Sequence, residues 1–336
     1  MKKTISKKSW LSLAIIAAFL IILLCLPLFI TNSYFITTLI TTFVFAALGV
    51  AWNIIGGYGG QISWCHAAFL AIGSYTSFII YKAFEISPFL TFPIGCVIAY
   101  VLATAIGYGT FKLRGPFFSL STIAFAEVIR ILLLYFRDLT NGANGLWLSY
   151  KEPNFFALMF ADDKPFYYIF LALLVVVLII ARAFERSKTG HYLSAIKGDE
   201  DAATSLGIVT FKVKLHAFQM SAVLASLIGT FYAFFLTYID PTTVCGVDTS
   251  IKIGFMAIVG GLGALWGPVL GAFVLIPFIN IVNLLLGNIG GAGQFAYGII
   301  LILIVIFRPN GLISFFQKDP NKKSFFSRKG KGENTA

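Results

Sequence analysis

A glutamate and an arginine lie three residues apart inside an apolar stretch of this sequence. Glu127 and Arg130 belong to SLSTIAFAEVIRILLLYF, and on a helix the i, i+3 spacing puts both side chains on one face, where they can pair. Each charge alone would cost about 2.5 to 3.5 kcal/mol at the centre of a bilayer, so we expect the pair to face protein or water. Such a pair could couple an ion gradient to transport, line a solute path, or form a structural ion pair.

Two glycine-rich segments interrupt the apolar stretches. The first holds four glycines just before Gln61 and His66, and the second reads GGLGALWGP at residues 260–268. Broken helices at membrane depth are tolerated where they line a cavity or are buried in protein, and in transporters they line the path. The predicted path residues are Gln61, His66, Glu127, Arg130, Gly260, Gly261 and Gly263. Close helix packing through small residues is the alternative for the glycines, and a hydrogen-bonded structural role is the alternative for His66.

The histidines and cysteines give no sign of a metal or catalytic site. None of the histidines is beside a paired carboxylate, and no metal-ligand spacing occurs among His66, His191, His216, Cys25, Cys65, Cys96 and Cys245. The phosphate-loop pattern G-x-x-x-x-G-K-[ST] is also missing. We therefore predict no enzymatic activity and no cofactor bound by the chain itself. If the protein is an active pump, a partner must hydrolyse the ATP.

The composition indicates how these residues are positioned. Of 336 residues, 58% are hydrophobic and 12% are charged, whereas soluble domains are about 25% charged. The apolar stretches are long enough to cross a bilayer as helices, so we predict an all-α polytopic membrane protein. About ten spans fit, some of them broken by glycine or proline: 11–30, 35–55, 66–81, 88–110, 117–136, 166–184, 215–238, 250–264, 267–286 and 292–307.

The basic residues predict how the chain is oriented. They account for a net charge of +11 and flank the apolar stretches, rather than following an aromatic-studded surface as nucleic-acid binding would require. Ten spans with the basic segments inside place both termini in the cytoplasm. We predict one transmembrane domain over residues 1–312. We expect residues 313–336 to form a basic, disordered cytoplasmic tail that anchors the topology by contact with anionic lipid.

Residues 182–214 form a long charged segment between two apolar spans. Connections between elements are usually short, whereas this one has about 30 residues. We predict a helical turn at 190–197 and a short helix at 199–206, with Asp199 as N-cap and Gly207 after the C-terminus. Exposed apolar side chains among the charges favour a docking surface over a solvated connector. Its predicted residues are Gly190, Lys197, Asp199, Glu200, Asp201, Ala202, Ala203 and Gly207, with Leu193, Ile196, Leu206 and Ile208 as the exposed apolar side chains.

Six blocks of the sequence together resemble one family. In order they are GGQISWCHAAFLAIGSYTS, RGPFFSLSTIAFAEVIRIL, LTNGANGL, KTGHYLSAIKGDEDAATSLGI, VGGLGALWGPVLGA and FRPNGL, and they span most of residues 48–312. They resemble the LivM-like permease subunits of ATP-binding cassette importers for branched-chain amino acids. The sequence departs from that pattern at Cys65 and Asn141, where the family usually has glycine, which puts the local backbone shape at both positions in question.

The resemblance implies an import function and a set of partners. These are a second, LivH-like permease, two cytoplasmic ATPase subunits that dock on residues 182–214, and a solute-binding protein, assembled in the inner (plasma) membrane. The outer segment 137–164 is the candidate contact for the solute-binding protein. The implied cargo is a branched-chain or related amino acid; urea, short amides and other amino acids are the alternatives within the family. A secondary transporter driven by an ion gradient is the alternative outside it, with Glu127 and Arg130 as its coupling site.

Overall fold

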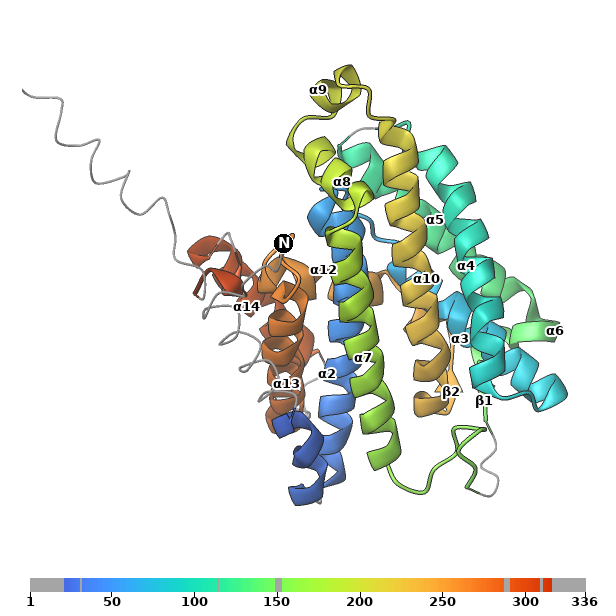
Figure 1. Ribbon diagram of the computed structural model, residues 1–336. Coiled ribbons are helices and arrows are strands. Elements are labelled where there is room, and N and C mark those ends of the chain that lie inside the picture. The colour runs from blue at the N-terminus through green and yellow to red at the C-terminus, as the bar shows by residue number, and fades with distance from the viewer. Residues whose placement is uncertain are drawn as a thin grey trace, which may run out of the picture.

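The computed structural model is a bundle of long helices (Figure 1). It describes residues 21–30, 32–113, 115–148, 153–286, 291–308 and 311–315. Within these residues, seven helices are long and apolar enough to cross a membrane: Ser33–Tyr58, His66–Phe84, Pro88–Thr110, Pro116–Tyr135, Lys164–Glu185, Thr210–Leu236 and Gly267–Leu286. The chain is therefore an all-α polytopic membrane protein, as its composition predicted.

The seven long helices are joined by shorter elements. The first consists of α2 (Ser33–Asn53) and a π-helical turn, η1 (Ile54–Tyr58), and the other six are α3, α4, α5, α7, α10 and α13 in the order just given. Two shorter apolar helices are α12 (Val247–Gly260) and α14 (Ala292–Phe307). The connecting elements are α6 (Arg137–Thr140), η2 (Gly142–Asn144), β1 (Leu146–Trp147), α8 (Lys188–Gly198), α9 (Glu200–Ser205), β2 (Tyr238–Ile239), α11 (Pro241–Cys245) and η3 (Leu312–Phe315).

Nine of the predicted spans correspond to helices, with ends that differ by a few residues. The largest difference at a start is in α10, which begins at Thr210 instead of 215. The predicted span 250–264, which runs into the second glycine-rich segment, is broken, because α12 has only 14 residues and stops at Gly260. Half of the first predicted span, residues 11–20 of 11–30, and most of the predicted tail, 313–336, lie outside the described residues.

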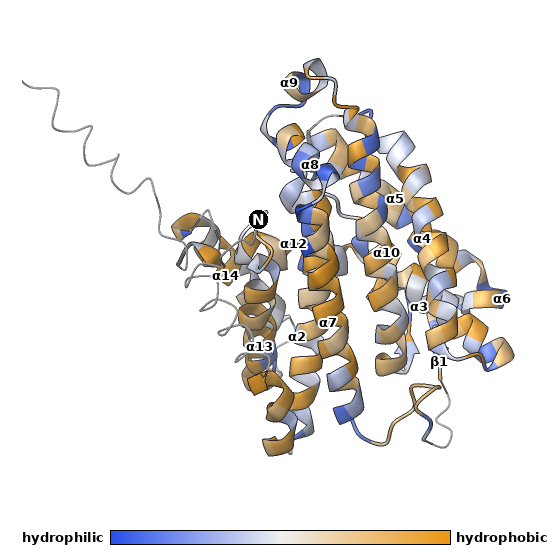
Figure 2. Cartoon of the chain, viewed as in Figure 1, coloured by the Kyte–Doolittle hydropathy of each residue, from blue (hydrophilic) through white to orange (hydrophobic). Residues whose placement is uncertain are grey.

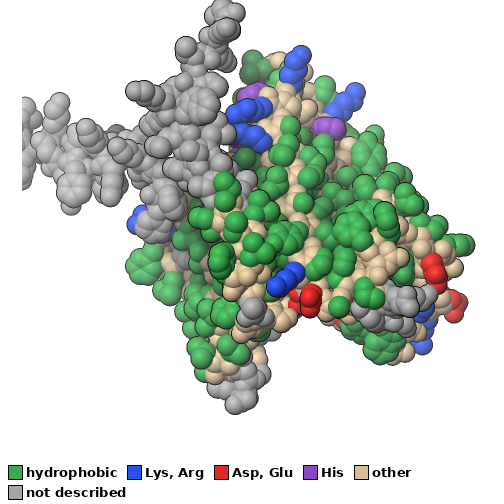
Figure 3. All heavy atoms as spheres, turned by 60° about the horizontal axis from the view of Figure 1, so that its bottom comes forward, with side chains coloured by type: hydrophobic (Ala, Val, Ile, Leu, Met, Phe, Trp, Pro, Cys, Tyr) green, Lys and Arg blue, Asp and Glu red, His purple; other side chains and the backbone are tan. Residues whose placement is uncertain are grey.

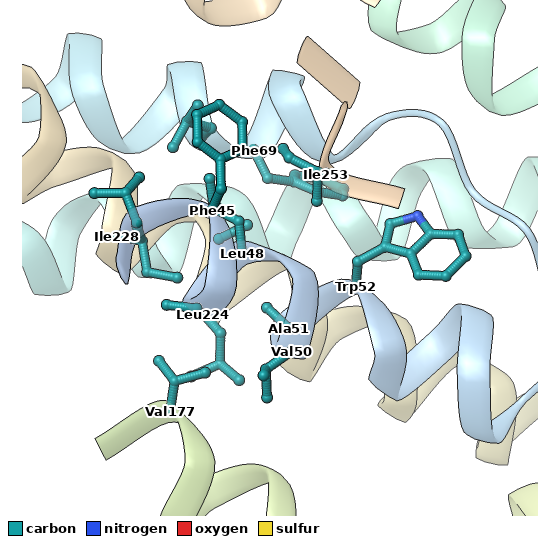
Figure 4. Packing of buried hydrophobic residues seen from close by; sticks show 14 of the residues in the cluster. Phe45, Leu48, Val50, Ala51, Trp52, Phe69, Val177, Leu224, Ile228 and Ile253 are labelled. Carbon is teal, nitrogen blue, oxygen red and sulfur yellow. The ribbon is translucent and has the colours of Figure 1, made fainter. Parts of the chain in front are cut away.

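The core of the bundle surrounds α2. This helix contacts α7, α10, α12 and α13, and its side chains are buried along most of its length. Figure 4 shows Phe45, Leu48 and Trp52 of α2 packed among Phe69, Leu224 and Ile253 from other helices. Helices α3 and α10 approach closely, because a Cβ added at Gly73 would lie 1.9 Å from the carbonyl oxygen of Ser226. Small residues allow such close contact between membrane helices.

The two ends of the bundle differ. Helices α8 and α9 project from one end, whereas α6 and the β1–β2 pair lie at the other (Figure 1). Apolar residues dominate the helices between them (Figure 2), and hydrophobic side chains cover large parts of the described surface in Figure 3. Helices α4, α5 and α13 bury the smallest shares of their apolar windows among the seven long helices. These faces are therefore available to lipid or to another membrane subunit.

Candidate functional site

The first glycine break brings irregular backbone into the bundle. After η1, residues 59–65 run between α2 and α5 before α3 begins at His66. Trp52 Nε1 donates to the Ser63 carbonyl at 2.6 Å, and Ser119 Oγ donates to the Ile62 carbonyl at 2.7 Å. The Trp64 N–H donates to Thr122 Oγ1 at 3.1 Å. Neighbouring helices thus supply hydrogen bonds that regular secondary structure would otherwise provide, as membrane depth requires.

His66 joins three helices in the core. Its Nε2 lies 2.6 Å from Ser221 Oγ of α10, and the Ser221 hydroxyl donates to the Ala51 carbonyl of α2 at 2.6 Å. Because that hydroxyl has a single proton, it accepts from His66, which assigns the imidazole proton to Nε2. The ring is completely buried. This geometry favours the structural interpretation of His66 over a path-lining one.

The second break is the turn between α12 and α13. A Cβ added at Gly260 would lie 1.7 Å from the Gly267 carbonyl oxygen, so the two helices pack closely where they meet. Gly261 and Gly263 have φ angles of 129° and 78°. Glycine reaches these angles without the steric cost that other residues have. All three predicted glycines therefore shape the turn.

The two breaks meet at Asn53, the last residue of α2. Its Oδ1 accepts from the Gly263 N–H at 3.0 Å, and its Nδ2 donates to the Ala264 carbonyl at 3.1 Å. A Cβ added at Gly57 would lie 1.8 Å from Asn53 Oδ1 and 2.7 Å from Gly263 N. Gln61 is half-buried, and its backbone N–H donates to the Ile55 carbonyl at 3.2 Å. Asn53 was not among the predicted site residues, although it is a polar residue at the end of an apolar helix and shortly before the glycine pair Gly56–Gly57.

Glu127 and Arg130 form the predicted pair on α5. Arg130 Nε donates to Glu127 Oε2 at 2.9 Å, and Arg130 Nη2 donates to Glu127 Oε1. The side chains are 39% and 25% exposed, respectively, and α5 is the least buried of the seven long helices. Within the described residues the pair is internal to α5 and makes no hydrogen bond to the two glycine breaks. It therefore lies on a face that another chain or water must cover, because lipid would leave the charges poorly solvated.

The charged connector is shorter than predicted. Arg182 lies within α7, which ends at Glu185, and Lys212 and Lys214 lie within α10. The connector thus covers residues 186–209 and holds α8 and α9. The predicted caps are confirmed, because Asp199 Oδ1 accepts from the N–H groups of Asp201 and Ala202 at 2.9 Å and Gly207 has a φ of +85°.

The apolar side chains of this connector divide into two sets. Leu193 and Ile196 are buried, so the prediction that they are exposed was wrong: α8 packs them onto the bundle, with Leu193 beside Gly59. Leu206 is 83% exposed. It belongs to a pocket of about 500 Å³ lined by Tyr192, Leu206, Gly207, Ile208, Val209, Lys212 and Val213. Exposed apolar surface of this kind is suited to a protein contact.

Several predicted docking residues have partners inside the chain. Lys214 Nζ donates to Glu200 Oε2 at 2.6 Å, and the Lys214 side chain is only 4% exposed, so this pair holds α9 on α10. Lys197 Nζ donates to the Gly57 carbonyl at 2.7 Å. A Cβ added at Gly190 would lie 2.3 Å from the Phe184 carbonyl oxygen. Ala203 is buried, whereas Asp201 and Ala202 are exposed.

The opposite end holds a two-stranded antiparallel sheet, in which Leu146 pairs with Ile239 and Trp147 pairs with Tyr238. Asn141 stands where the family usually has glycine, and its φ of 59° is in the left-handed region that glycine favours. Cys65, the other departure from the family pattern, has a φ of −105°, which does not require a glycine. Asp240 caps α11 by accepting from the N–H groups of Thr242 and Thr243 at 2.9 Å. Burial raises the pKa of Asp240, but these hydrogen bonds outweigh it and leave the pKa below its usual value.

Comparison with known proteins gives the family. The sequence model described as "Branched-chain amino acid transport system / permease component" matches residues 32–307. The chain is 26% identical to the high-affinity branched-chain amino acid transport system permease protein LivM of Escherichia coli, over 81% of this chain and 68% of that protein. It is 25% identical to LivM of Salmonella typhimurium, over 84% and 71%, and 26% identical to LivH of Salmonella typhimurium, over 69% and 79%. No solved structure matches. Because the family model covers nearly all of the helical bundle, the chain belongs to the family of branched-chain amino acid transport permease components.

Proposed function

We propose that this chain is the membrane-spanning permease subunit of an ATP-driven importer that carries branched-chain or related amino acids into the cytoplasm. The observation that carries the proposal is the family match over residues 32–307, which includes both glycine breaks and the α8–α9 connector. Both LivM and LivH, its relatives, are named as permease proteins of high-affinity branched-chain amino acid transport. The cargo assignment rests on those names.

The proposed topology has about ten crossings with both termini inside. Helices α12 and α14 would join the seven long helices as shorter crossings, and residues 11–30 would supply the remaining one. Gly311, after α14, lies against Gly261, and Gly263 lies near Lys197, so the end of α14 and the α8–α9 connector share one end of the bundle. That end carries Arg186, Lys188, Lys197 and Lys212. The positive-inside rule assigns it to the inner face of the plasma membrane.

The proposed docking site for the two ATPase subunits is the α8–α9 connector. Buried Leu193 and Ile196 fix α8 to the bundle, and the Glu200–Lys214 pair fixes α9 to α10. The pocket around Leu206 is left open toward solvent. The inner side of the connector is thus fixed to the bundle, and its outer side exposes apolar residues. Such a surface is suited to bind a partner and to transmit the partner's movement to the bundle. ATP is then hydrolysed by these partners and not by this chain.

A second, LivH-like permease is proposed to cover the α5 face. The Glu127–Arg130 pair lies on this exposed span, and a second subunit would shield it from lipid. In this arrangement the path runs between the two permeases, with Glu127 and Arg130 along it. The inner side of α5 contacts Ile62, Trp64 and the α11 region, which places the helix next to irregular backbone. The opposite end, with α6 and the β1–β2 pair, is the proposed contact for a solute-binding protein.

Purification and reconstitution test this proposal. The chain is purified in mild detergent from its native membrane, all co-purifying proteins are identified, and the assembly is placed in liposomes with ATP and radiolabelled leucine. We expect two ATPases, a second permease, and leucine uptake that requires ATP and the solute-binding protein. Recovery of the chain alone, with uptake driven by an ion gradient, would overturn the proposal in favour of a secondary transporter. ATP-driven uptake of urea or a short amide in preference to leucine would overturn the cargo assignment alone.

A further inference from the structure

We propose that Lys197 is a positioning residue that ties the end of α8 to both glycine breaks, so that displacement of α8 moves the backbone at Gly57 and at Gly263. The direction of this transmission, from ATPase to bundle, rests on the proposed function. The physical link does not, because it is made entirely within this chain.

The link is a side chain that crosses from one element to two others. Lys197 Nζ donates to the Gly57 carbonyl at 2.7 Å, over 140 residues of sequence. A Cβ added at Gly263 would lie 3.4 Å from the same Nζ, and one added at Gly60 would lie 3.1 Å from Lys197 Cγ. The ammonium group thus lies where η1 and the α12–α13 turn meet, and its aliphatic stem covers the start of the 59–65 segment.

The charge of Lys197 suits this position. Gly57 is in the π-helical turn that ends the α2–η1 helix, where the final carbonyl groups lack partners within the helix and carry partial negative charge. A lysine commonly caps such carbonyls from its own chain segment. Here the cap comes from a different helix, so the Gly57 carbonyl is capped by Lys197 only while α8 stays in place.

The contact acts on both breaks because Asn53 joins them. Its side chain holds the N–H of Gly263 and the carbonyl of Ala264, and Gly57 has no room for a Cβ between them. A π-helical turn is a local departure from the regular helix that is frequent at functional sites. Lys197, Asn53 and the two breaks therefore form one mechanical unit, which we name the Lys197 joint (Asn53, Gly57, Lys197, Gly263 and Ala264).

Contacts other than that of Lys197 also hold α8 on the bundle. Leu193 and Ile196 already bury the inner face of α8, and the N-cap of α8 is Ser187, whose hydroxyl accepts from the Gly190 N–H at 3.2 Å. Replacing Lys197 should therefore leave α8 docked and loosen only the joint. This separates a positioning role from a general contribution to stability.

The test compares Lys197→Met with Lys197→Arg in the complete assembly. Methionine keeps most of the aliphatic stem but cannot donate, whereas arginine keeps the charge and the donors. Hydrogen–deuterium exchange is measured at residues 55–60 and 261–264, together with leucine uptake and ATP hydrolysis in liposomes. Because a hydrogen bond from a charged donor shifts an opening equilibrium by roughly 10- to 100-fold, we expect exchange in Lys197→Met to be faster by that order at both segments. We also expect fewer leucine molecules per ATP, with the ATPases still bound, and recovery toward wild type in Lys197→Arg.

Two results would overturn the inference. Wild-type exchange at both segments in Lys197→Met would show that the joint is held by other contacts. Faster exchange with an unchanged ratio of leucine to ATP would show that the joint does not take part in coupling. A wild-type preparation that lacks ATPases contradicts the proposed function instead, and the exchange measurement on the purified chain then still decides whether Lys197 holds the two breaks.

Discussion

Asn53 binds the turn at Gly263 through both atoms of its amide group, although the two residues are 210 positions apart. These two hydrogen bonds join the end of α2 to the turn between α12 and α13. The two glycine-rich interruptions of the sequence therefore form a single structural feature. An amide is well suited to this role, because it accepts from one backbone group and donates to another without carrying a charge into the core.

Replacing Asn53 with leucine should therefore destabilise the protein. The variant loses two hydrogen bonds worth about 1 kcal/mol each, so we expect the free energy of unfolding to fall by about 1–2 kcal/mol. The midpoint of thermal unfolding in detergent measures this. The matched control is Asn144→Leu, because Asn144 lies in the exposed η2 turn at the other end of the bundle. Equal midpoints for the two variants would show that the Asn53 amide is not a significant link.

The sequence predicted the helices and their caps well because both depend on local patterns. Apolar stretches predict the long helices. The side chain of Asp199 and the positive φ available to Gly207 predict where α9 begins and ends, and both residues lie close to it in the sequence. The contacts of the candidate site depend on distant residues instead. Nothing near Lys197 in the sequence indicates Gly57 as its partner, and the burial of Leu193 becomes visible only when α8 is seen lying on the 59–65 segment.

The Glu127–Arg130 pair should be required for transport, whereas insertion should fail only when one charge of the pair is left without the other. Arg130→Met leaves Glu127 unpaired at membrane depth, which costs about 2.5 to 3.5 kcal/mol on insertion scales, so we expect less of the variant in the membrane. The double variant Glu127→Gln with Arg130→Met removes both charges and should insert at the wild-type level. We expect leucine uptake by the double variant to remain impaired, because the path would have lost its charged groups.

The matched control for Arg130→Met uses a second i, i+3 pair of arginine and glutamate in the described helices. Arg182 and Glu185 lie at the end of α7, are 45% and 33% exposed, and are joined at 2.6 Å. An exposed pair of this kind contributes less than about 1 kcal/mol, so Arg182→Met should insert normally. Normal uptake by the Glu127–Arg130 double variant would assign that pair a structural role and remove it from the path.

Gly207 offers the sharpest test of the ATPase-docking surface. Its φ of +85° is strained for a β-branched residue, while the space around its Cα is open, so Gly207→Val should disturb the backbone beside Leu206 without a clash in the core. We expect this variant to insert and to unfold at a near-normal temperature but to lose co-purifying ATPases. Gly207→Asn is the control, because asparagine tolerates the left-handed region better than other non-glycine residues. If the valine variant retains its ATPases as well as the asparagine variant does, the partner docks elsewhere on this end of the bundle.

Asp199→Ala should weaken co-purification of the ATPases less than Gly207→Val does, since loss of the N-cap costs about 1 kcal/mol and loosens α9 alone.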